Sequence, residues 1–437
     1  MRRNHVLVVA SFIGIFVLAH SGLATDLAIS QVAVIDPSDG SLAREMTVII
    51  RGDRILSVAH GSAIPRGATV IDGRGKYLIP GLWDMHVHLG SIAQAEKDLP
   101  LAVAAGVTGL RDMGTPLNAA LAIRAAVRRD QGPELYVSGP LLNGPLPFKT
   151  PLIENIATPE EAVATVKRLI AAGVDFIKVH DVLGAPEYDA IAAECRKRHA
   201  VFAGHVPVAV TAEHAALAGQ HSIEHLGGRF YGVMLACSRE ESSLTAKVRD
   251  FLAQLANELS AGKEPDDRAL FTEEFTRPMV ETFDSKKASH LIRTFRAQHT
   301  WQCPTVVSLP LCQALARTDM SSADRKWAEA LFREMQGLTS RIATENRTVL
   351  AGTDAPLSEP KIHEELELLV AAGLSPLDAI RAATINPARY LGRTSDFGRV
   401  RKGQIANLAL LNANPLENIT NTRRIAAVIL HDRIVPR

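Results

Sequence analysis

Between residues 78 and 391, short apolar runs alternate with longer stretches whose apolar positions recur at helical spacing. The apolar runs have the length of buried strands, and we predict strands at 77–88, 106–113, 134–139, 175–180, 201–206, 222–226, 300–309 and 348–354. Alternation of this kind, eight times over, is typical of an α/β fold and specifically of a (β/α)8 TIM barrel. The active site of such a barrel lies at the carboxyl ends of its strands.

Both ends of the chain carry a different pattern, in which turns separate short β-rich runs. These runs lie at 32–35, 46–50, 54–59, 407–411 and 426–430. We therefore predict a small composite β-sandwich domain made of residues 25–77 and 394–437, beside a barrel of residues 78–393. Two insertions interrupt the barrel pattern, a Pro/Gly-rich loop at 140–151 and a helical insertion at about 237–298. The second is either a lid over the site or a peripheral decoration.

Composition and charge narrow the class of protein. The 437 residues are 47% hydrophobic and carry a formal net charge of +1, which indicates a globular chain with a large core. The sequence shows no basic stripe interleaved with aromatic residues, so no nucleic acid is expected as a partner. The expected partner is a small-molecule substrate, and self-association into a homo-oligomer is left open.

Residues 1–24 have the pattern of a secretory signal peptide. Arg2 and Arg3 precede an apolar run at 6–19, and the small residues Gly22 and Ala24 lie where a signal peptidase cleaves. The run has about 14 residues, whereas a bilayer span needs roughly 20, which disfavours an uncleaved anchor. We therefore expect a periplasmic or secreted protein with no stable membrane anchor after cleavage. Export permits a disulfide, but free thiols are the default expectation for Cys195, Cys237, Cys303 and Cys312.

Polar residues recur where the predicted barrel strands end. His86 and His88 share one face of the first strand, although a pair of histidines alone could simply hydrogen-bond in a core. Lys178 lies in an apolar strand, where it must be neutral, paired or converted by carbon dioxide to a carbamate. The full set of candidate ligands is His86, His88, Lys178, His205, His225 and Asp354. Such a set fits two bridged divalent ions.

These motifs resemble those of the metal-dependent amidohydrolase superfamily, in the branch that holds imidazolonepropionase and prolidase-like dipeptidases. The resemblance rests on PGLWDMHVH at 80–88, GVTGLRD at 106–112, IK at 177–178, GH at 204–205, IEH at 223–225 and AGTD at 351–354. It implies that His86 and His88 hold the more buried ion with Asp354 and that His205 and His225 hold the other. It also implies that Lys178, as a carbamate, bridges the ions. The chain departs from these relatives at His180-Asp181, where they have a turn of small residues.

The resemblance implies an exported hydrolase of carbon–nitrogen bonds, with dipeptides or N-acyl amino acids as substrates. A hydroxide bridging two zinc ions would attack the carbonyl carbon, and Asp354 would carry the proton to the leaving group. Manganese, cobalt or iron could replace zinc. One alternative is hydrolysis of a cyclic amide, lactone or other ester-like bond. Another is a metal-holding binding protein without activity, which the complete ligand set disfavours.

Residues around the ligands complete the hypothesis. His180, Tyr231 and Arg229 are candidates for substrate binding, each with a structural role as its alternative. Asp84 is expected to orient a metal ligand or to pair with Arg111. We further expect Arg111 and Asp112 to form an internal pair below the metals, and Glu224, which points away from His225, to be structural.

Overall fold

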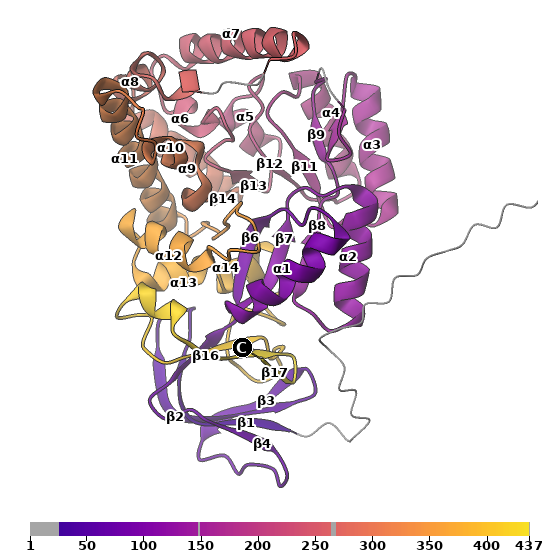
Figure 1. Cartoon of the computed structure of the whole chain (residues 1–437), viewed down its shortest axis with the longest axis vertical. Coiled ribbons are helices and arrows are strands. Elements are labelled where there is room, and N and C mark those ends of the chain that lie inside the picture. Colours follow the sequence, from indigo (N-terminus) through magenta and orange to yellow (C-terminus); the bar gives the residue numbers. More distant parts are fainter. Residues whose placement is uncertain (1–25, 147–148, 264–267, 437) are drawn as a thin grey trace, which may run out of the picture.

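The computed structural model describes residues 26–146, 149–263 and 268–436 (Figure 1). The predicted signal peptide lies outside the described residues. Within them, no helix is both long and apolar enough to cross a bilayer.

The barrel strands form two parallel sheets. One contains β6 (Leu82–Val87), β7 (Val107–Asp112) and β8 (Glu134–Val137) in that order. The other has the order β10-β9-β11-β12-β13-β14, with bounds Ile153–Asn155, Leu141–Asn143, Ile177–Val179, Phe202–Gly204, Ser222–Glu224 and Trp301–Cys303. Seven of these strands lie within predicted strand runs. The short strand β9 lies inside the predicted Pro/Gly-rich loop at 140–151, and β10 follows directly after it. β9 pairs with β11 on one side and with β10 on the other.

Backbone hydrogen bonds join the two sheets at both edges. On one side, the Asp175 amide donates to the Val137 carbonyl at 2.8 Å, which links the chain before β11 to β8. On the other side, the amide of Leu350 donates to Gln302 at 2.8 Å, and the amide of Met85 donates to Ala351 at 2.9 Å. The eighth predicted strand is therefore present as a run that bonds to both β14 and β6, and the α/β barrel prediction is confirmed.

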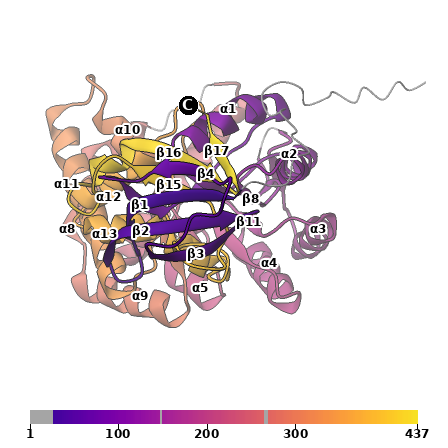
Figure 2. The same ribbon diagram turned by 90° about the horizontal axis from the view of Figure 1, so that it is seen from below.

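Helices surround the strands, as the view from below shows (Figure 2). Several begin at a side chain that caps the first turn: Ser91, Thr158, Thr211, Asp284, Ser321 and Ser375 each accept a backbone N–H. The helices are α1 (Ile92–Ala104), α2 (Leu117–Arg129), α3 (Pro159–Ala172), α4 (Ala185–Lys197), α5 (Ala212–Leu217), α9 (Ser285–Ala297), α10 (Pro310–Leu315), α11 (Ser322–Glu345), α12 (Ile362–Ala371), α13 (Pro376–Ala382) and α14 (Ile385–Tyr390). Their apolar faces cover the strands in one continuous core.

The predicted insertion after β13 is helical. It contains α6 (Gly232–Ala236), α7 (Glu241–Ser260), the short helix η1 (Arg268–Phe271) and α8 (Glu273–Glu281), and it ends in α9. α7 lies across the end of the barrel opposite the β domain (Figure 1). α9 packs against α5 and so belongs to the layer of barrel helices rather than to a separate decoration.

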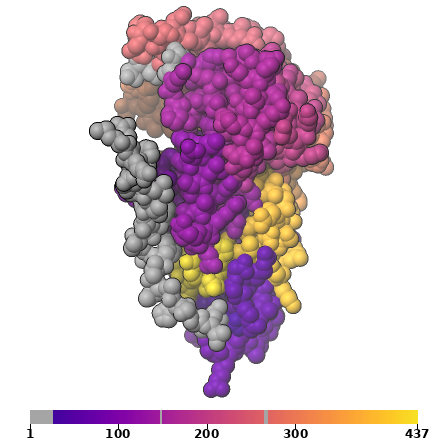
Figure 3. Space-filling view, turned by 90° about the vertical axis from the view of Figure 1, so that its right-hand side faces the viewer, coloured from indigo at the N-terminus to yellow at the C-terminus, as the bar shows by residue number. Residues whose placement is uncertain are grey.

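The two ends of the chain build one sheet, in the order β17-β16-β15-β5-β1-β2-β3 with β4 beside β1. The strands are β1 (Leu27–Ile35), β2 (Leu42–Arg51), β3 (Arg54–His60), β4 (Thr69–Asp72), β5 (Tyr77–Pro80), β15 (Leu408–Leu411), β16 (Ile425–Leu430) and β17 (Arg433–Val435). β5 joins the halves, because it pairs with β1 on one side and with β15 on the other. A β domain built from both ends of the chain is therefore present as a single sheet, and Figure 3 shows it stacked against one end of the barrel.

Alternation along β5 explains how this domain attaches. Ile79 faces the barrel and joins its core, whereas Leu78 faces the other way and joins a second apolar cluster with Leu408 and Val48. The sheet thus has one face on the barrel and a small core of its own on the other. Residue 80, where β5 ends, lies two residues before β6, so the sheet sets the first barrel strand in place.

Candidate metal centre

The two histidines of the first barrel strand face the same acid. β6 is buried throughout, and His88 follows its last residue, so alternation places His86 and His88 on one face as predicted. The Nε2 atoms of His86 and His88 lie 3.8 Å and 3.3 Å from Oδ1 of Asp354. The Nδ1 atoms point away from it, toward Glu224 Oε2 at 2.9 Å and the Gly114 carbonyl at 2.8 Å.

The histidines of the fifth and sixth strands show the same arrangement. His205, which follows β12, has its Nδ1 atom 2.7 Å from Oδ1 of Asp181. His225, which follows β13, has its Nδ1 atom on the hydroxyl of Thr305 and its Nε2 atom 3.7 Å from Oδ2 of Asp354. The ring centroids of His86 and His225 lie 4.5 Å apart, and those of His205 and His225 lie 5.0 Å apart.

All four imidazoles are therefore anchored through Nδ1, by a carboxylate, a backbone carbonyl or a hydroxyl. An acceptor at Nδ1 favours the tautomer that carries the proton there and leaves the lone pair of Nε2 for a metal. The donor atoms of His86, His225 and Asp354 all lie within 4.8 Å of one another. This arrangement fits a divalent cation held by imidazole and carboxylate.

Lys178 lies at the centre of β11 and is only 1% exposed. Its Nζ atom has no hydrogen-bond partner among the described residues. Burial lowers the pKa of Lys178 to about 8, so roughly a tenth of the amine is neutral at pH 7 and about half at pH 8. An unpaired buried amine is costly to keep in a core, and the site fits a lysine whose amine is converted to a carbamate that binds cations.

Asp354 ends the run that closes the barrel. Burial opposes its ionisation, but the hydrogen bond from His88 and the neighbouring His225 hold the pKa of Asp354 well below its usual range. Its position is fixed by Asp84, whose carboxylate accepts the Thr353 amide at 2.9 Å and the Thr353 hydroxyl at 2.6 Å. Of the two roles expected for Asp84, the structure thus shows support of a ligand and not pairing with Arg111.

Strained backbone gathers around the centre. His225, Leu226, Thr305 and Asp354 have φ of 55°, 53°, 47° and 49°, in the left-handed region that non-glycine residues rarely adopt. Each such residue costs on the order of 1–3 kcal/mol and persists only where its surroundings hold it. Residues of this kind are typical of functional sites.

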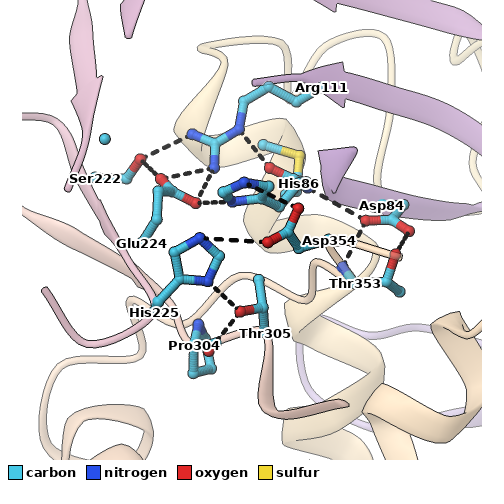
Figure 4. Close-up of polar contacts among 12 residues, drawn as sticks. Asp84, His86, Arg111, Ser222, Glu224, His225, Pro304, Thr305, Thr353 and Asp354 are labelled. Carbon is cyan, nitrogen blue, oxygen red and sulfur yellow. Dashed lines mark hydrogen bonds and ion pairs between the residues drawn. The ribbon is translucent and has the colours of Figure 1, made fainter. Parts of the chain in front are cut away.

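The predicted pair of Arg111 and Asp112 is wrong. Arg111 is fully buried and donates instead to both carboxylate oxygens of Glu224, each at 2.9 Å, and to the Met85 carbonyl at 2.6 Å (Figure 4). Asp112 accepts the Thr115 hydroxyl at 2.8 Å. The physical reason is the period of the strand, because adjacent residues of β7 point to opposite faces and cannot pair with each other.

Glu224 is the residue that sequence reasoning missed. It was expected to be structural, yet its carboxylate accepts both the Nδ1–H of His86 and the guanidinium of Arg111 (Figure 4). The side chains of Arg111, Glu224 and His86 are each at most 1% exposed. The sequence carries a signal for this contact. A carboxylate within a buried strand needs a cationic partner, and Arg111 is a cation within another apolar strand.

The predicted substrate residues lie in different surroundings. The ring of His180 stacks on that of His205, with centroids 4.3 Å apart, and its side chain is 24% exposed. Its Nδ1 atom has no hydrogen-bond partner among the described residues, unlike the Nδ1 atoms of the four candidate ligand histidines. Tyr231 is fully buried, and Arg229 is exposed on the same loop. The structure therefore places His180 at the centre, beside His205.

Comparisons with known proteins agree with this architecture. Residues 327–435 match the Amidohydrolase family. A segment of 64 residues is 42% identical to a dihydroorotase from Trichlorobacter lovleyi, and the match spans 15% of this chain and 15% of that protein. The fold is similar to a structure described as a prolidase from Bifidobacterium longum, with a TM-score of 0.72, 24% identity, and coverage of 95% and 96% of the two chains. It is also similar to a Xaa-Pro dipeptidase with bound methionine, with a TM-score of 0.69, 18% identity, and coverage of 94% and 99%.

Proposed function

Because the C-terminal quarter of the chain carries an Amidohydrolase family domain on a prolidase-like fold, we propose that the protein is a metal-dependent hydrolase of amide carbon–nitrogen bonds. One observation carries the proposal. Lys178 is a buried amine without a hydrogen-bond partner among the described residues, and it lies amid imidazoles that are anchored through Nδ1. If divalent cations bind there, the imidazoles and a carbamate on Lys178 can hold them for hydrolysis. A protein that only binds a ligand would have no use for this combination.

The residues divide into two half-sites. His86 and His88 would hold one divalent ion with Asp354, and His205 and His225 would hold the other. The neutral amine of Lys178 would add to carbon dioxide and release one proton, which yields a carbamate whose oxygens can bind both ions. Zinc suits imidazole and carboxylate ligands. When bound, divalent ions at such a site lower the pKa of water toward roughly 7 and polarise a carbonyl oxygen.

Asp354 is the group that moves a proton. Its carboxylate is 29% exposed, faces His88 and His225, and stays ionised because its pKa is low. It would accept the proton of the attacking water and deliver it to the leaving nitrogen as the amide bond breaks. Asp84 and Thr353 hold this carboxylate in place during the transfer.

Dipeptides and N-acyl amino acids are the proposed substrates, in line with the prolidase and the dipeptidase whose fold the chain shares. His180 would contact the substrate, because its ring borders the centre and its Nδ1 atom has no hydrogen-bond partner among the described residues. Roles for Tyr231 and Arg229 in substrate binding stay predictions. Export to the periplasm or the medium, inferred from residues 1–24, is part of the same proposal.

The experiment is a screen of the zinc-loaded protein against dipeptides, N-acyl amino acids, lactams and lactones. We expect turnover of linear amides, and exclusive turnover of lactams or lactones would favour the alternative of cyclic substrates. Lys178→Ala should lose both turnover and the carbamate signal seen by 13C NMR with labelled bicarbonate. Lys197→Ala, an exposed lysine on α4, is the matched control. A Lys178→Ala protein with unchanged metal content and turnover would refute the carbamate model.

A further inference from the structure

The turn after β14 holds one of the ligand histidines. Thr305 has φ of 47° and ψ of 51°, a left-handed conformation that is especially costly for a β-branched residue. Its hydroxyl donates to the Pro304 carbonyl at 2.8 Å, so the hydroxyl oxygen is left to accept the Nδ1–H of His225 (Figure 4). The turn thereby selects the tautomer and the ring orientation that His225 needs to offer Nε2 to a cation.

Glu365 anchors the same turn from a distant part of the chain. It lies on α12, is fully buried, and its Oε2 atom accepts the Val307 amide at 2.9 Å. Val307 belongs to η2 (Val306–Ser308), the short helix that begins directly after Thr305, and α12 packs against η2. A left-handed Thr305 persists only if the residues beside it are held, and Glu365 supplies that restraint from outside the turn.

Burying the carboxyl group of Glu365 costs free energy, which indicates that this side chain does more than fill space in the core. Burial raises the pKa of Glu365 to about 8, against the hydrogen bonds from the amides of Val307 and Val306. Its second oxygen has no hydrogen-bond partner among the described residues. An apolar side chain of similar volume would fill the space without that cost, but it could not accept the Val307 amide. What the carboxyl contributes is therefore the restraint on η2.

We propose that Glu365 is a positioning residue of the metal centre, which holds Val307, keeps Thr305 in its left-handed conformation and so fixes the orientation of His225. The inference rests on the proposed function only in taking His225 as a metal ligand. Glu365 itself touches neither a ligand nor a substrate. Replacing Glu365 should consequently change the affinity for the metal, and this change should depend on Thr305.

The test measures zinc affinity by competition with a chromogenic chelator, which requires no substrate. Groups that support a metal ligand change affinity by roughly 10- to 100-fold when removed, and we expect Glu365→Ala to lose affinity within that range. Glu365→Asp, which shortens the side chain by one methylene, should lose less, and Glu365→Gln should stay within about threefold because its amide oxygen can accept the same N–H. Glu364→Ala, an exposed residue of the same helix, is the matched control.

A double-mutant cycle separates positioning from a merely structural role. If Glu365 acts through Thr305, then Glu365→Ala should cost little further affinity in a Thr305→Ala background. Losses that multiply in the double variant would overturn the proposal, as would an unchanged affinity in both Glu365→Ala and Glu365→Asp. If Glu365→Ala does not fold, judged by circular dichroism, the same cycle is run with Glu365→Asp. Wild-type protein that binds no zinc refutes the metal centre itself, whereas zinc binding without turnover refutes only the proposed function.

Discussion

Removal of the Glu224 carboxylate tests how the buried polar cluster supports the site. Glu224 and Arg111 are fully buried, and the carboxylate is shared between the guanidinium and the imidazole of His86. Removing one partner of a buried ion pair leaves an uncompensated charge and costs ~3–5 kcal/mol. We therefore expect Glu224→Ala to lower the free energy of unfolding of the metal-free protein by this amount. Zinc affinity should fall by roughly 10- to 100-fold, because His86 loses the acceptor that orients it.

The double variant Arg111→Met/Glu224→Leu separates the two effects. Replacing both members of a buried pair by apolar residues of similar size is often neutral for stability, so unfolding in urea should return toward the wild-type free energy. Zinc affinity should stay low, because the Nδ1 atom of His86 still lacks an acceptor. Arg277→Met, which removes an exposed ion pair with Glu281 on α8, should change neither measurement and serves as the control.

Two results would refute this reasoning. One is a Glu224→Ala protein whose free energy of unfolding lies within about 1 kcal/mol of the wild type, since removing one partner of a buried pair costs more. The other is a double variant that regains both stability and zinc affinity, because Glu224 would then not orient His86.

Three further predictions follow from the same geometry. His180→Ala should raise KM more than it lowers kcat and leave zinc content unchanged, with Lys197→Ala as the exposed comparison; a loss of zinc would instead make His180 a support for His205. The raised pKa of Glu365 means that the folded state binds a proton more tightly than the unfolded chain, so this group's contribution to stability is complete below pH about 4 and is lost as pH rises toward 8. Glu365→Gln should therefore flatten the fall in urea midpoint of the metal-free protein between pH 5 and 8, and an unchanged slope would contradict the assignment. Removal of metal by a chelator should abolish turnover and zinc should restore it, while hydrolysis by the stripped protein would exclude a metal mechanism.

Local sequence was sufficient to bring the candidate ligands to one end of the barrel. A period of two puts His86 and His88 on one face, and the alternation of strand and helix brings the ends of successive strands to one end of a barrel. His205, His225 and Asp354 follow from the same rule, since each lies at or near the end of a predicted strand. The same period excludes a pair of Arg111 and Asp112, because adjacent residues of a strand point to opposite faces.

What the sequence by itself determined about this protein is thus the barrel, the sheet built from both ends of the chain, and the residues that line the site. Only the tertiary structure decided which groups hold those residues in place. Glu224 meets Arg111 across 113 residues, and Glu365 meets Val307 across 58. These partners lie on different elements, and hydrogen bonds between them depend on packing distances of a few tenths of an ångström, for which periodicity carries no signal.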